Sequence, residues 1–111
     1  MNGAESLLTT LVNNNIEVCF TNPGTSEMHF VAALDEVDGM RCVLCLFEGV
    51  LSGAADGYAR ASGKPGICMA QVIGALNLAA GLRDAWLAKS PVIAMTGGRD
   101  PNTKFRGVYQ E

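Results

Sequence analysis

The pattern that most constrains this chain is a regular alternation of helical and extended segments. The sequence predicts helices over residues 4–14, 27–36, 49–62 and 75–88, with apolar residues at helical spacing in the first and a closing glycine, Gly63, after the third. Short apolar runs predict strands over residues 16–20, 41–46, 66–70 and 91–96. Strands that alternate with helices are typical of an α/β fold, so we expect a parallel sheet with helices on both faces.

Length, composition and charge limit the classes of function. The 111 residues suit a single domain, 1–111, and a hydrophobic content of 49% with 17% charged residues is that of a globular protein. The net charge of -3 argues against a nucleic-acid partner. No apolar run approaches the roughly 20 residues of a membrane span, and no basic stretch precedes an apolar one at the N-terminus. We therefore expect a cytoplasmic protein with no membrane partner.

The cysteines do not suggest a metal site. Four of them, Cys19, Cys42, Cys45 and Cys68, fall in the expected strands. Cys42 and Cys45 have C-x-x-C spacing, but residues three apart on a strand point to opposite faces. With one histidine, His29, and no second cysteine pair, we expect buried free thiols and no metal.

Glu48 stands where a strand should end and a helix begin. The apolar run 40–47 predicts a buried strand before it, and the helix after it is rich in glycine, alanine and serine. Ligands of parallel α/β sheets bind at the carboxyl ends of strands, and small residues allow a flat ligand to approach. An acidic residue at a helix N-terminus is also favoured by the helix dipole alone. The pattern leaves both interpretations of Glu48 open.

Three other loops should reach the same edge of the sheet, over residues 21–26, 71–74 and 97–102. The first contains Pro23 and Gly24 and ends at Ser26, a plausible N-cap for helix 27–36. Neither G-x-x-x-x-G-K-[ST] nor G-x-G-x-x-G occurs after the first strand. A flavodoxin-like nucleotide-binding domain is therefore disfavoured.

In their order and spacing, these segments resemble the N-terminal pyrimidine-binding domain of thiamine diphosphate enzymes of the acetolactate synthase and benzoylformate decarboxylase group. The matching stretches are T-N-P-G-T-S-E (21–27), E-G-V-L-S-G-A-A-D-G-Y-A-R (48–60), G-A-L-N-L-A-A-G-L-R-D-A-W (74–86), S-P-V-I-A-M-T-G (90–97) and Y-Q-E (109–111). The resemblance implies the flavodoxin-like thiamine diphosphate-binding fold, in truncated form.

The resemblance also implies roles for particular residues. Glu48 would hydrogen-bond the aminopyrimidine of thiamine diphosphate and so activate the cofactor for decarboxylation or ligation of a small 2-keto acid. The other cofactor-binding residues implied are Pro23, Gly24, Gly74 and Asn77. The substrate-side residues implied are Thr25, Ser26, Phe47 and Gln110.

Two departures from the family pattern lie close to the expected site. Many members have histidine where this chain has Phe47, and the family's G-P-G loop is Val72-Ile73-Gly74 here. The β-branched side chains of Val72 and Ile73 are stiff, which works against a close approach of this turn to the cofactor ring. Asn77 is retained.

The family's catalytic chains are several times longer and contain a second domain that binds the diphosphate and magnesium through G-D-G…N-N, a motif that is absent from this sequence. The resemblance therefore implies a partner domain, from the same or another chain, and a homo-oligomer, either a dimer or a tetramer. The isolated chain should be inactive. The alternative is an inactive fragment or a remnant that binds a partner through helix 75–88. Because that helix is apolar nearly all round, we expect it to be buried on more than one side.

Overall fold

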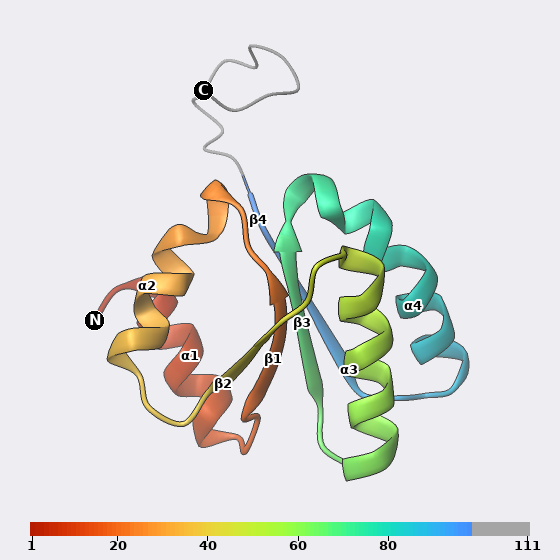
Figure 1. Ribbon diagram of the computed structural model, residues 1–111. Helices are drawn as coiled ribbons and strands as arrows, with labels where there is room; N and C mark the ends of the chain where they lie inside the picture. The colour runs from red at the N-terminus through yellow and green to blue at the C-terminus, as the bar shows by residue number, and fades with distance from the viewer. Residues whose placement is uncertain (99–111) are drawn as a thin grey trace.

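The computed structural model describes residues 1–98, which form four parallel strands in one sheet flanked by helices (Figure 1). The strands are β1 (Val18–Asn22), β2 (Arg41–Leu44), β3 (Gly66–Gln71) and β4 (Val92–Gly97), in the order β2-β1-β3-β4. The helices are α1 (Gly3–Asn13), α2 (Met28–Glu36), α3 (Glu48–Ser62) and α4 (Ala75–Leu87), with short 3-10 turns η1 (Thr25–Glu27) and η2 (Val72–Gly74). The predicted α/β fold with a parallel sheet is confirmed.

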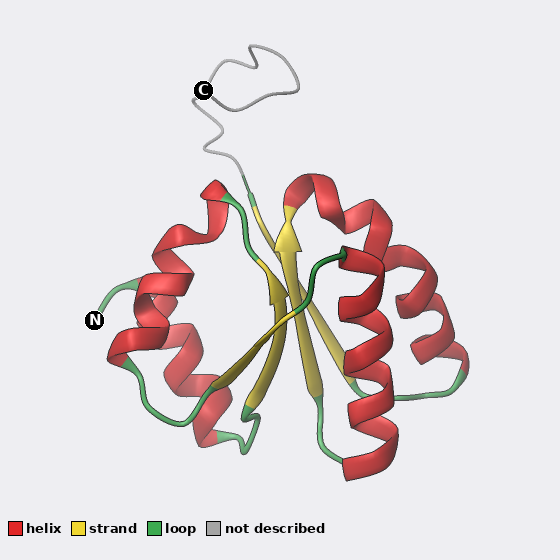
Figure 2. Ribbon diagram, in the orientation of Figure 1, coloured by secondary structure: helices red, strands yellow, loops and turns green. Residues whose placement is uncertain are grey.

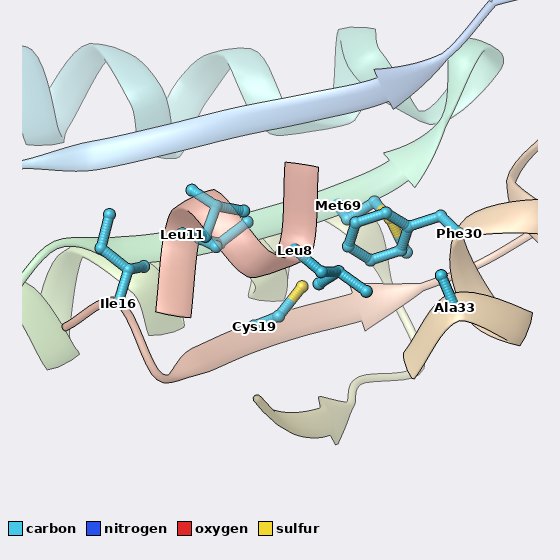
Figure 3. Close-up of a cluster of buried hydrophobic side chains, with 8 residues drawn as sticks. Leu8, Leu11, Ile16, Cys19, Phe30, Ala33 and Met69 are labelled. Atoms are coloured by element: carbon cyan, nitrogen blue, oxygen red, sulfur yellow. The ribbon is translucent and has the colours of Figure 1, made fainter. Parts of the chain in front are cut away.

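Helices lie on both faces of the sheet (Figure 2), and each face has its own apolar core. Helices α1 and α2 cover one face, where Leu8, Leu11, Ile16, Cys19, Phe30, Ala33, Ile67 and Met69 are buried together (Figure 3). Helices α3 and α4 cover the other face, where Leu51, Ala55, Cys68, Ala70 and Leu78 are buried. The expectation of helices on both faces is therefore confirmed.

Local signals mark the start of α1 and the end of α3. Asn2 and Glu5 form a reciprocal capping box at the start of α1, with the Asn2 side chain accepting from the Glu5 N–H at 3.0 Å. Gly63 ends α3 with a left-handed φ of 71°, as its position in the sequence predicts.

The first strand begins two residues later than predicted, at Val18 rather than Ile16. Asn15 has a φ of 60°, and the N–H of Ile16 donates to the Leu11 carbonyl at 3.1 Å. Ile16 is buried, but it belongs to the turn that closes α1. The apolar side chain of Ile16 indicates that the residue is buried, but it does not indicate that the residue pairs in a strand.

The expectation of a buried second strand over 40–47 is wrong. Strand β2 ends at Leu44 and lies at the edge of the sheet, where Leu44 is 65% exposed. The expectation that all four thiols are buried within strands is wrong for the same reason, because Cys42 on β2 is exposed and the half-buried Cys45 follows the strand.

The expectation that helix 75–88 is buried on more than one side is also wrong within residues 1–98. Only Leu78 and Ala85 of α4 are buried, while Leu76 is 84% and Trp86 is 75% exposed. The buried side packs closely on α3, where Gly81 lies against Ser52 with no room for a Cβ. Among residues 1–98, no helix combines the length and the apolar character that crossing a membrane requires.

The strand order places a topological switch point at the carboxyl edge of the sheet. Strands β1 and β3 are neighbours, but the chain leaves β1 toward α2 and leaves β3 toward α4, on opposite faces. A point at which successive crossovers diverge in this way is where open α/β sheets bind their ligands. The carboxyl ends of β1 and β3 therefore frame the candidate site.

Candidate cofactor site

Glu48 is the first residue of α3, and its carboxyl group is held by two carboxamides from distant parts of the chain. Asn22 at the end of β1 donates its Nδ2 to Glu48 Oε1 at 3.4 Å, and Asn77 in the first turn of α4 donates its Nδ2 to Oε2 at 3.2 Å. The predicted pair Glu48 and Asn77 thus comes together. Asn22 is a partner that the sequence interpretation missed, although its place at the end of the first strand is a usable signal.

Gly74 lies against the side chain of Glu48. A Cβ added at Gly74 would stand 2.6 Å from Glu48 Cγ, which is shorter than any tolerable contact. Val72 and Ile73, the other two residues of this turn, are 38% and 54% exposed. Gly74, the one glycine of this turn, therefore lies in close contact with Glu48.

Pro23 and Gly24 continue from β1 into η1 and lie across from β3. Gly24 packs on the Gln71 side chain at the end of β3, where an added Cβ would approach Gln71 Cδ to 2.7 Å. Thr25 is exposed and Ser26 is half-buried. The prediction that Ser26 is the N-cap of the next helix is wrong, because Gly24 stands at the N-cap of η1 and Glu27 precedes α2.

Glu27 is a second carboxyl group at this edge, and the sequence interpretation gave it no role. Its side chain is buried, accepts from the Gly24 N–H at 2.8 Å and from the Ser26 hydroxyl, and lies against Gly97 at the end of β4. The sequence contains a signal for this role, because Glu27 follows Gly24 by three residues, and a glutamate at that distance from an N-cap can accept a hydrogen bond from the N-cap N–H.

The apolar neighbours of Glu48 in sequence do not enclose it within the described residues. Leu46 is 89% exposed, and Phe47 and Val50 are each about half exposed, whereas Leu51 is buried in the α3–α4 core. Phe47 has an extended backbone at the N-cap of α3, and its ring lies over Gly49. The carboxyl group of Glu48 is thus reachable from solvent.

No cation neutralises Glu48 among residues 1–98, where the ion pairs are Asp56–Arg60, Glu17–Lys64 and the N-terminus with Glu5. The same residues contain no cluster of three metal-ligating side chains. Two surface hollows, one by Trp86 and one by the exposed His29, lie away from Glu48. Gln110, predicted on the substrate side, lies outside the described residues.

These groups fit a flat heteroaromatic ligand. Each oxygen of Glu48 accepts one carboxamide hydrogen bond and keeps a further lone pair for a donor on a ligand. Gly74 leaves the flank of the carboxyl group without a side chain. Glu48 thus offers free acceptor positions at the switch point, where open α/β sheets bind their ligands.

Comparison with known proteins identifies the protein family to which this chain belongs. The whole chain, residues 1–111, matches the family described as "Thiamine pyrophosphate enzyme, N-terminal TPP binding domain", and it belongs to that family. The relatives and the structural neighbour below are longer chains named as acetolactate synthases and as a benzoylformate decarboxylase, so the sequence resemblance to this group is confirmed.

The similar proteins are acetolactate synthases and a decarboxylase. The Mycobacterium tuberculosis protein "Putative acetolactate synthase large subunit IlvX" is 53% identical over 98 residues, covering 87% of this chain and 19% of that protein. The chloroplastic acetolactate synthase of Arabidopsis thaliana is 44% identical over 96 residues, covering 86% of this chain and 14% of that protein. The structure of benzoylformate decarboxylase from Polynucleobacter necessarius superposes with a TM-score of 0.79 at 25% identity, covering 91% of this chain and 19% of that one. This chain thus spans less than a fifth of the length of each.

Proposed function

We propose that this chain is the pyrimidine-binding half of a thiamine diphosphate-dependent enzyme that decarboxylates or ligates small 2-keto acids, in the manner of an acetolactate synthase. The observation that carries the proposal is the Glu48 carboxyl group at the switch point, held by Asn22 and Asn77 and flanked by Gly74. Membership of the family and the similarity to acetolactate synthases support the same function.

Glu48 is the cofactor-activating acid in this proposal. Its carboxyl group binds a ring nitrogen of the aminopyrimidine and exchanges a proton there, while Asn77 and Asn22 orient the two carboxyl oxygens. Pro23, Gly24 and Gly74 would hold the ring beside Glu48. When bound, thiamine diphosphate supplies an electron sink for breaking or making a bond to the keto carbon.

Thr25, Ser26, Phe47 and Gln110 are assigned to the substrate side. Thr25 and Phe47 are exposed and stand at the beginnings of η1 and α3, on the same edge as Glu48. An apolar ring at Phe47 in place of a polar side chain favours contact with the apolar part of a 2-keto acid.

The diphosphate and magnesium are assigned to a domain outside this chain, in the same or a second polypeptide of a cytoplasmic homo-oligomer. The exposed apolar side chains of α4, including Leu76 and Trp86, support contact with another domain or subunit. Exposed apolar patches commonly mark interaction surfaces.

Replacement of Glu48 by glutamine tests the proposal in the protein expressed at its natural length. Glutamine keeps the size and one carbonyl oxygen but cannot exchange the proton, so turnover of a 2-keto acid with thiamine diphosphate and magnesium should fall about 10²–10⁴-fold. The thermal unfolding midpoint should be unchanged. The exposed Glu36→Gln of α2 is the matched control and should keep full turnover. Full turnover in Glu48→Gln would refute the assignment.

The second candidate function is an inactive remnant that binds a partner through the outer face of α4. The exposure of Leu76, Trp86 and Leu87 favours it. Under this alternative, the unmodified protein at natural length turns over no 2-keto acid, and Trp86→Ala abolishes its association with the partner.

A further inference from the structure

Cys19 and Cys42 stand side by side across the outer pair of strands. They are register partners in the parallel pairing of β1 with β2. Neighbouring strands lie about 4.7–4.9 Å apart, and disulfides bridge Cα atoms separated by about 4.4–6.8 Å. Because register partners on adjacent parallel strands point to the same face, both side chains stand on the face that α1 and α2 cover.

The other two cysteines belong to the opposite face of the sheet. Cys68 is part of the core with Leu51, and Cys45 packs against that same core. All four thiols are free. Cys42 is thus placed to pair with Cys19, in preference to its C-x-x-C neighbour Cys45.

Access to solvent distinguishes the two members of the pair. Cys19 is fully buried beside Leu8 and Leu11 (Figure 3), whereas Cys42 is exposed because β2 is an edge strand. The neighbouring Cys19 thiol lowers the pKa of Cys42, and the neighbouring Cys42 thiol, together with burial, raises the pKa of Cys19. The thiolate is the reactive form, so Cys42 is the thiol that meets an oxidant and Cys19 the one that resolves it.

We propose that Cys19 and Cys42 form a peroxide-reactive thiol pair that closes to an intramolecular disulfide between β1 and β2. The Cys42 thiolate attacks one oxygen of hydrogen peroxide, the O–O bond breaks, and Cys42 becomes a sulfenic acid as hydroxide leaves and takes up a proton to form water. The Cys19 sulfur then attacks the Cys42 sulfur, the S–O bond breaks, and the hydroxyl group leaves with the Cys19 proton as a second water. Two electrons pass from the two sulfurs to the peroxide.

The disulfide would fasten the strand that leads into the candidate site. Strand β2 ends at Leu44, the Cys45 N–H donates to the Thr21 carbonyl at 3.0 Å, and the chain then runs directly to Glu48. The bridge adds a covalent link to an edge strand that is otherwise held by hydrogen bonds to β1 alone among the described residues. The proposal holds whether or not Glu48 activates a cofactor.

The test is oxidation with hydrogen peroxide, followed by alkylation of remaining thiols and peptide mass spectrometry, on the protein at its natural length. The expected product is a peptide pair joined through Cys19 and Cys42 that has lost the mass of two hydrogen atoms and is restored by dithiothreitol. Cys42→Ser, an exposed position, should abolish the product, and the matched control Cys45→Ser should retain it. The oxidised protein should unfold several degrees higher than the reduced one.

A second variant separates the two steps of the reaction. In Cys19→Ala, Cys42 should stop at the sulfenic acid and be trapped by dimedone. A Cys42–Cys45 bridge, a disulfide between two molecules through Cys42, or full alkylation of both thiols after peroxide would each overturn the proposal.

Discussion

Two glutamates stand at the carboxyl edge of the same sheet and differ in almost every other respect. Glu27 is buried, and both of its carboxyl oxygens accept hydrogen bonds from its own turn, from Gly24 and Ser26. Glu48 is half-exposed, and its two hydrogen bonds come from carboxamides 26 and 29 residues away in sequence. The first is enclosed by the fold, whereas the second is oriented by the fold and left open to a ligand.

The comparison shows that two carboxyl groups at one edge of a sheet can differ in role: one stabilises the fold, and the other is available to a ligand. A buried polar group must find its partners within the protein, since an unmade hydrogen bond costs about 1–3 kcal/mol. Glu27 meets that demand locally and shapes the turn that carries Pro23 and Gly24 against Gln71. Glu48 retains lone pairs that the described residues do not use. We therefore expect substitutions at Glu27 to alter folding and substitutions around Glu48 to alter cofactor binding.

The largest effect on stability should come from Glu27→Met. Methionine fills a similar volume but accepts no hydrogen bond from the Gly24 N–H, so the free energy of unfolding should fall by about 1–3 kcal/mol. Urea denaturation measures the change. Glu36→Met on the exposed side of α2 is the matched control and should stay within about 0.5 kcal/mol of the unmodified protein. An unchanged urea midpoint in Glu27→Met would contradict the structural role of Glu27 and so its difference from Glu48.

An intermediate effect should follow from Gly74→Ala. The added Cβ would meet Glu48 Cγ at 2.6 Å, so the Glu48 side chain must shift and its bond to Asn77 must weaken. The affinity for thiamine diphosphate, measured by calorimetry on the complete enzyme, should fall about tenfold, or about 1.4 kcal/mol.

Gly53→Ala in α3 is the control for this substitution. An added Cβ at Gly53 meets no atom within 4 Å. Alanine is favoured over glycine inside a helix by roughly 0.5–1 kcal/mol, so this variant should be slightly more stable with unchanged cofactor affinity. Equal affinity loss in both glycine variants would mean that the crowding of Glu48 is not the cause.

The smallest effect concerns a third acidic residue, Asp56, in the middle of α3 and away from the edge. Arg60 donates to it through Nε at 2.9 Å and Nη2 at 2.7 Å, and this pair holds the pKa of Asp56 below its usual value. A lowered folded-state pKa stabilises the fold above the unfolded value of about 3.9, and this contribution is lost as the pH falls through the folded value.

Asp56→Asn should therefore reduce stability slightly at pH 7 and flatten its loss between neutral and strongly acidic pH. Thermal unfolding as a function of pH measures both changes, and Asp35→Asn on the exposed side of α2 is the control. An acid-induced loss of stability that is equally steep in Asp56→Asn and in the unmodified protein would contradict the role of the pair.

Much of this fold follows from signals that are local in the sequence. The small-residue helix after Glu48, its closing Gly63 and the alternation of strands and helices depend on spacing within a few residues, and the structure confirms them. The position of Glu48 at the start of α3 also follows from a local signal, the change from an apolar run to a helix rich in small residues. The capping role of Glu27 was within reach of the same kind of argument, three residues after Gly24.

The errors about the second strand and the fourth helix concern exposure to solvent, which no local pattern in the sequence determines. The apolar run around β2 suits a central strand, but the order β2-β1-β3-β4 puts it at the edge and leaves Cys42 and Leu44 in solvent. The apolar face of α4 suits burial on several sides, but α3 covers only one of them. Apolar residues in a sequence indicate that a segment tends to be buried, but they do not identify the element or the partner that buries it.

The amino-acid sequence by itself determined the alternation of helices and strands, the glycine that ends α3 and the position of the Glu48 carboxyl group at the start of a helix. These features depend on neighbours along the chain. Only the tertiary structure decided which groups surround that carboxyl group. Asn22 and Asn77 meet Glu48 because β1 pairs with β3 and α4 packs on α3. The pairing of Cys19 with Cys42 likewise depends on the register of two strands, which is set by long-range hydrogen bonds.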